Sequence, residues 1–448
     1  MKKNFYILLF FLFNCFTIAA EIYLNDADTA ISLGLANSKL LNEKQKSSLL
    51  QMKKSKYSIL PFLPRFSCGW NEHNQIIKQQ PDTRHKSIEF SVSQLLFDNG
   101  KTYLTYSINT YISFLSYLET QKEIREYALS ILETYYNLIL KNMMIKIKSE
   151  FLENTKNELE IIEYKYNSGL ALKTDLLEFQ ISCKELSNEL IKLNQEKHTL
   201  YSDLKFLLNL NEETKIILPE SVNEFYFPTD PLTPMLSQYK RKITEASLEI
   251  KQAEADFEYQ KKQYKISRQN FLPDISLEGI ISFSGSDYPL TQPDYSLKLV
   301  FSFSNLPFLP FQHNSLSELS NNKKYSFTNS TSATLSPDAT YFTQRKIQQS
   351  NLNQSRISLE KLINQTKNTI TELINTHDNL IEYISLLKET QKIKEEKIKI
   401  SEYEFENGLI KTNDYLKEKN EYSEYRQKLI SSQIELISLQ KKIQILIN

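Results

Sequence analysis

Most of the chain carries hydrophobic residues at helical spacing. Within Leu172–Leu207 apolar residues recur every three or four positions for about five heptads, and the same register recurs in Lys411–Leu446. Each of these two heptad seams follows a longer stretch that has apolar residues on more than one face, at about Lys101–Tyr166 and Tyr341–Phe405. At 1.5 Å per residue such a stretch forms a helix of about 100 Å. A helix-bundle core explains most stripes of this kind, but helices of this length favour an extended coiled coil.

Four short segments carry a different pattern, strict alternation of apolar and polar residues. They lie at about 61–71, 86–97, 273–284 and 294–304, and each has about the length of a tilted transmembrane β-strand. A half-buried sheet resting on helices fits the alternation equally well. Four strands cannot close a barrel, because transmembrane barrels start at about eight strands, and open edges in lipid leave backbone groups unpaired. If these strands enter a membrane, several chains must therefore share one barrel.

The two halves of the chain are copies of one another. Tyr164–Gly169 with Asp175 six residues after the glycine parallels Tyr403–Gly408 with Asp414. Each half is predicted to consist of a helix, two strands, a very long helix, a sharp turn and a second long helix. The second half carries about 30 additional residues, at about 304–340, rich in Ser, Asn, Thr and Pro, which predict an irregular insertion.

The duplication and the N-terminus divide the chain. Residues 1–20 have the pattern of a signal peptide, with basic residues, an apolar run and small residues before Glu21. Lipid attachment at Cys15 is the alternative. An uncleaved membrane anchor is less favoured, because the apolar run is too short to span a membrane. We then expect a first repeat over residues 21–210, a linker over 211–232 and a second repeat over 233–448.

Composition excludes several functions. The 54 basic and 54 acidic residues give a net charge of zero, which argues against nucleic-acid binding. Only seven glycines are present, and they form no phosphate-binding motif. The five histidines lack metal-site spacing. We therefore expect no enzyme, no cofactor and no metal, and we expect Cys68 and Cys183 to be thiols rather than part of a disulfide framework.

Taken together, these features resemble the TolC-like outer-membrane efflux protein family. The resemblance rests on the duplicated helix–strand–strand–helix–helix unit, the Leu-Pro pairs at Leu63 and Leu272, the segment Gln94–Gly100 and the glycine–aspartate spacing. It implies a mainly α chain that forms a homotrimer, with a twelve-stranded outer-membrane β-barrel continuing into a twelve-helix periplasmic α-barrel.

The resemblance also implies the function. Such a protein is the exit duct of a tripartite efflux or type I secretion system and conducts drugs, small toxic molecules or polypeptides, often with multidrug resistance as the result. Its partners are a periplasmic adaptor protein, an inner-membrane transporter and outer-membrane lipid. The alternative function is a periplasmic coiled-coil structural or adaptor protein without a pore, in which the strands form a small soluble domain.

The helix turns carry the candidate site residues. Gly169 and Gly408 would be C-caps with positive φ at the periplasmic tips, where the resemblance also places Tyr166 and Phe405 and the docking of the adaptor. Asp175 and Asp414 would follow at the aperture. In a trimer they would make a ring of carboxylates that favours cations, and each aspartate would also serve as an ordinary helix N-cap.

Two tip positions depart from the best-studied members of that family. Ile410 stands where an arginine helps to hold the aperture closed, and Lys417 stands where a second acidic residue lies. Glu178 occupies the equivalent of Lys417 in the first repeat. We therefore expect Glu178 and Lys417 to pair across the two hairpins at the aperture.

Overall fold

The computed structural model describes residues 21–75, 83–98, 100–211, 213–219, 230–269, 273–303, 310–319, 324–333 and 340–447. The expected signal peptide with Cys15 lies outside the described residues, as do residues 220–229 of the expected linker. The chain divides into two compact units. One comprises residues 1–43, 121–247 and 364–448, and the other comprises residues 44–120 and 248–363.

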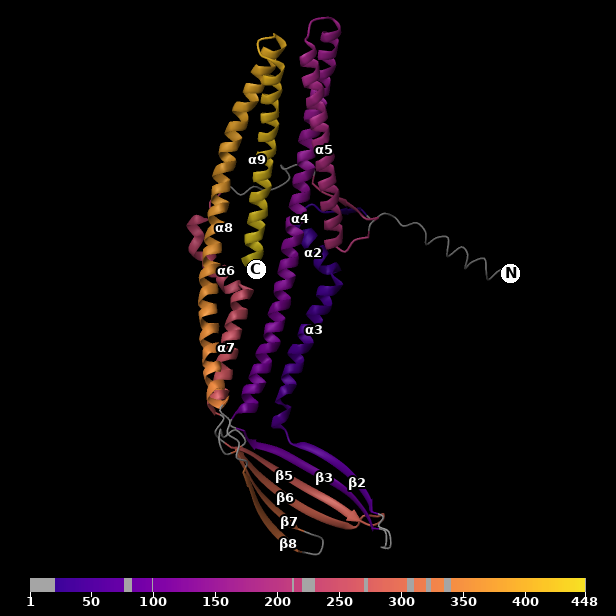
Figure 1. Cartoon of the computed structure of the whole chain (residues 1–448), viewed down its shortest axis with the longest axis vertical. Coiled ribbons are helices and arrows are strands. Elements are labelled where there is room, and N and C mark those ends of the chain that lie inside the picture. The colour runs from indigo at the N-terminus through magenta and orange to yellow at the C-terminus, as the bar shows by residue number, and fades with distance from the viewer. Residues whose placement is uncertain are drawn as a thin grey trace, which may run out of the picture. The chain divides into compact units, whose positions relative to one another are not determined.

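The first unit is built from two helical hairpins. The first hairpin consists of α4 (Lys101–Asn167) and α5 (Lys173–Leu207), and the second of α8 (Thr340–Glu406) and α9 (Thr412–Ile447) (Figure 1). The first parts of α4 and α8 belong to the other unit. The short helices α2 (Ala27–Asn37) and α6 (Leu236–Ala246) complete the helical part of this unit, and β1 (Glu21–Tyr23) pairs in parallel with β4 (Lys215–Ile217). The four long helices lie where the sequence predicts them, α5 and α9 at the heptad repeats and α4 and α8 in the longer stretches before them.

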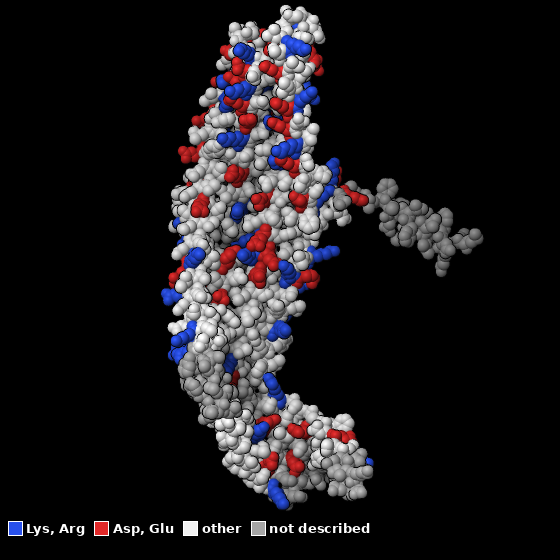
Figure 2. Space-filling model, in the orientation of Figure 1, with Lys and Arg blue, Asp and Glu red and all other residues white. Residues whose placement is uncertain are grey.

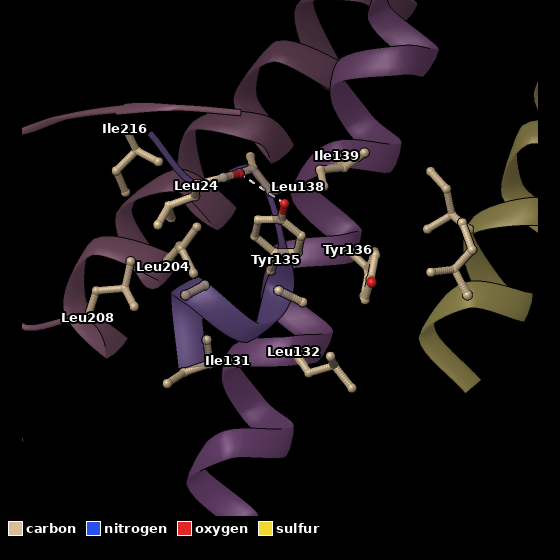
Figure 3. Packing of buried hydrophobic residues seen from close by; sticks show 14 of the residues in the cluster. Leu24, Ile131, Leu132, Tyr135, Tyr136, Leu138, Ile139, Leu204, Leu208 and Ile216 are labelled. Carbon is tan, nitrogen blue, oxygen red and sulfur yellow. Dashed lines mark hydrogen bonds between the residues drawn. The ribbon is translucent and has the colours of Figure 1, made fainter. Parts of the chain in front are cut away.

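The core of the first unit gathers where α2 and both strands meet α4 and α5. Ile131, Tyr135 and Leu138 of α4 are fully buried there, together with Leu204 and Leu24. Figure 3 shows the Tyr135 ring among these side chains, with its hydroxyl donating to the Leu24 carbonyl at 3.0 Å. That bond satisfies the one polar group of a buried tyrosine. Burial of this cluster fixes the segment around Leu24 against the first hairpin.

The second unit contains a six-stranded antiparallel sheet. Its order is β2 (Arg65–Gln75), β3 (Thr83–Phe97), β5 (Asp274–Gly285), β6 (Gln292–Phe303), β7 (Phe311–Leu319) and β8 (Tyr325–Ala333). The helices α3 (Lys39–Lys56) and α7 (Leu248–Gln269) precede the two strand pairs. The four expected strands are present, although β2 begins later than the pattern suggests because Tyr57–Phe62 forms a 3₁₀ turn around Pro61.

The insertion is not irregular in its described part, which corrects the expectation for residues 304–340. Residues 311–319 and 325–333 form β7 and β8, which extend the sheet beyond β6. Serine and asparagine suggest a loop by composition, but these strands gain their ladder hydrogen bonds from β6 and from each other. The sheet of one chain therefore has six strands rather than four.

Within the described residues, no helix is at once long enough and apolar enough to cross a membrane.

Candidate functional site at the helix turns

Each hairpin turns at a glycine in the left-handed conformation. Gly169 has φ 74° and Gly408 has φ 72°. At both turns the glycine N–H donates to the carbonyl three residues back, and the next N–H donates five residues back, as in Leu170 to Lys165 at 2.8 Å. This is the Schellman arrangement, and it satisfies carbonyls that the helix end leaves free. The turns therefore have the positive φ that the sequence predicts for these glycines.

Asp175 joins the two hairpins as well as capping its own helix. One carboxylate oxygen accepts the backbone N–H of Leu172 at 3.2 Å, across the first turn of α5. The other oxygen accepts the Thr412 hydroxyl at 2.7 Å, at the first residue of α9. Asp175 is the third residue of α5 and not its N-cap, which is Leu172, and it caps the helix by accepting the backbone N–H of that residue. Its second bond was not visible in the sequence because it depends on how the hairpins pack.

Asp414 has a different environment. It occupies the corresponding first turn of α9, yet its side chain is exposed. The duplicated positions have thus diverged, since Asp175 is held between helices and Asp414 faces solvent. Of the two, Asp414 is the more exposed carboxylate.

An apolar cluster lies directly behind the turns. Phe179 is fully buried beside Ile162, Tyr415 and Leu416, and Ile410 packs against them. Phe405 stacks on the Tyr415 ring, with centroids 4.7 Å apart and planes at 3°, and contacts the Phe179 ring at 5.9 Å. These contacts connect all four long helices near the turns.

The two aromatic residues expected at the tips therefore differ in how far they are exposed to solvent. Phe405 lies largely in the cluster, whereas Tyr166 is 36% exposed. More strongly exposed apolar residues surround the turns, and the sequence argument did not single them out: Tyr164, Leu170, Leu172, Tyr403 and Leu409. Their positions next to the turn glycines were the available signal.

One face of α9 carries polar contacts to α4. The Lys419 ammonium lies 2.6 Å from Glu158, and the Tyr415 hydroxyl donates to the same Glu158 oxygen at 2.9 Å. Further along, Arg426 pairs with Glu150 at 3.2 Å. Thr412, Tyr415, Lys419 and Arg426 recur at spacings of three, four and seven, which places them along one side of a helix.

The contacts around Glu158 are shielded from water. The Lys419 side chain is 9% exposed and the Glu158 side chain 21%. Burial, followed by the Glu158 charge, raises the pKa of the Tyr415 phenol well above its ordinary value, so the phenol stays a neutral donor. The other Glu158 oxygen, Oε2, has no hydrogen-bond partner within the described residues. The pair is sensitive to the loss of either member.

The expected partners Glu178 and Lys417 are not joined in the described part of one chain, where no ion pair links them. Lys417 is exposed. The pKa of Glu421, one turn further along α9, is lowered mainly by the hydrogen bond from Lys394, and the charge of Lys417 adds to this effect. The second hairpin is instead closed by Lys394–Glu421 at 3.0 Å and Lys397–Glu418 at 2.8 Å. Pairing of Glu178 with Lys417 stays a prediction for contacts between chains.

The sheet provides a second surface with a clear polarity. On one face of β2, β3, β5 and β6 the paired positions are apolar, and many are exposed, including Phe66 at 78% and Trp70 at 65%. The opposite face carries Ser67 with Ser91 and Glu278 with Lys298. An exposed apolar band backed by a polar face is the pattern of a strand between lipid and water.

The fold thus combines two long helical hairpins in one unit with an antiparallel sheet of this polarity in the other. No protein-family profile matches the chain, and no curated protein matches it in sequence. Solved structures do match. CusC, described for transmembrane channel formation, has a TM-score of 0.67 at 13% identity, covering 97% of this chain and 96% of that one.

Two further channels extend the comparison. The outer membrane protein VceC of Vibrio cholerae has a TM-score of 0.74 at 12% identity, covering 94% of this chain and 95% of that one. The MtrE outer membrane channel of Neisseria gonorrhoeae, solved in its open state, has a TM-score of 0.71 at 11% identity, covering 94% and 88%. The chain therefore has the fold of the TolC-like outer-membrane channels, as the resemblance predicts.

Proposed function

We propose that this chain is the outer-membrane exit duct of a tripartite efflux or type I secretion system. It conducts drugs, small toxic molecules or polypeptides passively and performs no chemistry on them. The observation that carries the proposal is the strand polarity: an exposed apolar band on one face of the sheet, with charged and hydroxyl side chains on the other. The likeness to outer-membrane channels over nearly the whole chain supports it.

A shared barrel follows from the free edges of the sheet. Among the residues that the structure describes, no strand pairs with the outer edge of β2, and lipid does not tolerate unpaired backbone groups. We infer that three copies close one barrel and that their helical hairpins together form a periplasmic duct. Four lipid-facing strands from each copy give the twelve-stranded barrel that the resemblance implies.

The helix turns are the proposed aperture and docking site. Widening a duct at this end requires the second hairpin to move away from the first, which breaks the bonds from Asp175 and Glu158 to α9. Asp414 supplies the exposed carboxylate of each copy. The exposed Tyr164, Leu170 and Leu409 beside the turns suit contact with a periplasmic adaptor, because apolar surface of this kind is buried by a protein partner.

Gene deletion tests this function in the cell. A deletion strain is expected to become more susceptible to several chemically unrelated antibiotics or to lose a secreted polypeptide, and the wild-type gene is expected to restore the phenotype. Unchanged susceptibility and secretion, together with recovery of the protein as a water-soluble monomer without detergent, would favour the alternative of a periplasmic coiled-coil protein without a pore.

A further inference from the structure

The hairpin of β7 and β8 breaks the apolar band of the sheet. From Tyr295 to Phe303 each residue of β6 on the apolar face has a registered partner on β7, and each of these has a partner on β8. Opposite Phe301 stand His313 and Thr331, and opposite Leu299 stand Ser315 and Asn329. The apolar face of β2, β3, β5 and β6 thus gives way to polar residues over the middle of the hairpin.

Several polar side chains of the hairpin bond to one another. His313 Nδ1 lies 2.8 Å from the Thr331 hydroxyl, and the Ser317 hydroxyl donates to the Tyr325 hydroxyl at 2.7 Å, both across the β7–β8 pair. On the opposite face Ser326 donates to Glu318 at 3.3 Å. At mid-length that face carries Asn314, Ser330 and Thr328 around a single apolar residue, Leu316. Both faces of the hairpin are therefore largely polar at mid-length, which suits strands with water on both sides and not strands with one face in hydrocarbon.

The hairpin also occupies an edge that a closed barrel needs. The order β2-β3-β5-β6 is antiparallel throughout, so β2 of a second copy would meet β6 antiparallel and continue the apolar band with Phe66, Cys68 and Trp70. In one chain β7 covers that edge of β6 (Figure 1). If the hairpin stayed in the wall, every copy would place His313, Ser315 and Asn329 against lipid.

We propose, on the basis of the proposed function, that only β2, β3, β5 and β6 form the lipid-facing wall. On assembly β2 of a second copy takes the edge of β6, and the β7–β8 hairpin lies in the water-filled interior of the barrel and narrows it. The root of the hairpin stays at the end of β6, where the Phe303 and Phe311 rings stack at 4.3 Å. From there β7 runs beside β6 as far as Tyr295, so the hairpin has the length to line the interior at the level of the apolar band.

Thiol labelling in proteoliposomes tests the position of the hairpin. In a C68S/C183S background, S315C on the hairpin is compared with L299C, its registered partner on β6. A membrane-impermeant maleimide is expected to label S315C at least about ten-fold faster, because the reactive thiolate forms in water and not in lipid. N329C should behave like S315C. Native Cys68, on the apolar face of β2, is an internal control that should resist the reagent in the wild type.

Single-channel current in planar bilayers then locates the water-exposed hairpin. Labelling S315C with a bulky maleimide should lower the conductance, and replacing residues 304–339 by a short Gly-Ser linker should raise it. Protection of S315C and N329C to the same degree as L299C would place the hairpin in the lipid-facing wall and overturn the proposal. Labelling of S315C without any change in conductance would contradict the placement of the hairpin in the barrel interior. Rapid labelling of L299C and Cys68 would instead refute the barrel, and the hairpin proposal with it.

Discussion

At the scale of single residues, the two turn positions require glycine because of their backbone conformation and not because a side chain would lack space. A Cβ added at Gly408 would meet no atom within 4 Å, yet the residue has φ 72°. Gly408→Ala is therefore expected to destabilise the fold by about 1–2 kcal/mol through backbone strain alone. Thermal unfolding measures the effect. Gly69→Ala is the control, because Gly69 does not have positive φ and its nearest neighbour would lie at 4.0 Å. Equal stability of the two variants would contradict the assignment of the turn.

Asp175 and Asp414 are expected to respond differently to the same change. Asp175→Asn weakens the bonds to Leu172 and Thr412 and should cost about 1 kcal/mol of stability, as for a lost helix cap. Asp414→Asn alters an exposed side chain, so stability should hold while the channel's preference for cations falls. Thermal unfolding and reversal potentials under a salt gradient measure the two effects. A loss of stability in Asp414→Asn together with unchanged stability in Asp175→Asn would contradict the roles given to these residues.

Asp378 makes the stability of the first unit dependent on pH. Burial raises the pKa of its carboxyl, but hydrogen bonds from the Thr233 hydroxyl, from His377 and from the backbone N–H groups of Leu232 and Thr233 lower it by more. The net effect is a pKa lowered from 3.8 to about 2. A lowered pKa adds stability above the unfolded value of 3.8, and this contribution is lost as the pH falls toward 2.

Asp378→Asn should therefore lower the melting temperature at neutral pH, at a cost of about 1–3 kcal/mol for the unsatisfied donors. The difference from the wild type should shrink as the pH falls toward 2. Asp203→Asn, at an exposed site on α5, is the control. A deficit that stays constant down to pH 2 would show that the charge of Asp378 is not what stabilises this site.

At the scale of elements, the buried contacts between α9 and α4 hold the hairpins together. Lys419→Met leaves Glu158 buried with only the Tyr415 hydroxyl as a partner, and removal of one member of a buried pair costs about 3 kcal/mol or more. We expect a lower melting temperature and a higher single-channel conductance. Lys397→Met is the matched control, because its pair with Glu418 is 58% exposed at the lysine and should matter little. Unchanged conductance in Lys419→Met would argue that this contact does not restrain the duct.

The helices and strands were predictable because periodicity reports them directly. Heptad repeats located α5 and α9, long stretches with apolar residues on more than one face located α4 and α8, and alternation located β2, β3, β5 and β6. The hairpin of β7 and β8 was missed because its polar alternation is weak and its composition resembles a loop. The contacts of Asp175 with Thr412 and of Glu158 with Lys419 join residues far apart in sequence, so no local pattern could reveal them.

At the scale of the whole molecule, the 54 basic and 54 acidic residues cancel to a net charge of zero. On the face that Figure 2 shows, basic and acidic residues are interspersed along the helices. Interspersed charges of both signs give this face no strong field of one sign. In the proposed duct, selectivity would therefore depend on local groups such as those at the helix turns.

The central claim is that several copies of this chain form a membrane channel. The most direct measurement is single-channel current from the purified full-length protein in planar lipid bilayers, with oligomeric state measured on the same sample. We expect stable current steps from a detergent-solubilised trimer, with larger steps for Lys419→Met than for Lys397→Met. A water-soluble protein that never inserts and carries no current would contradict it.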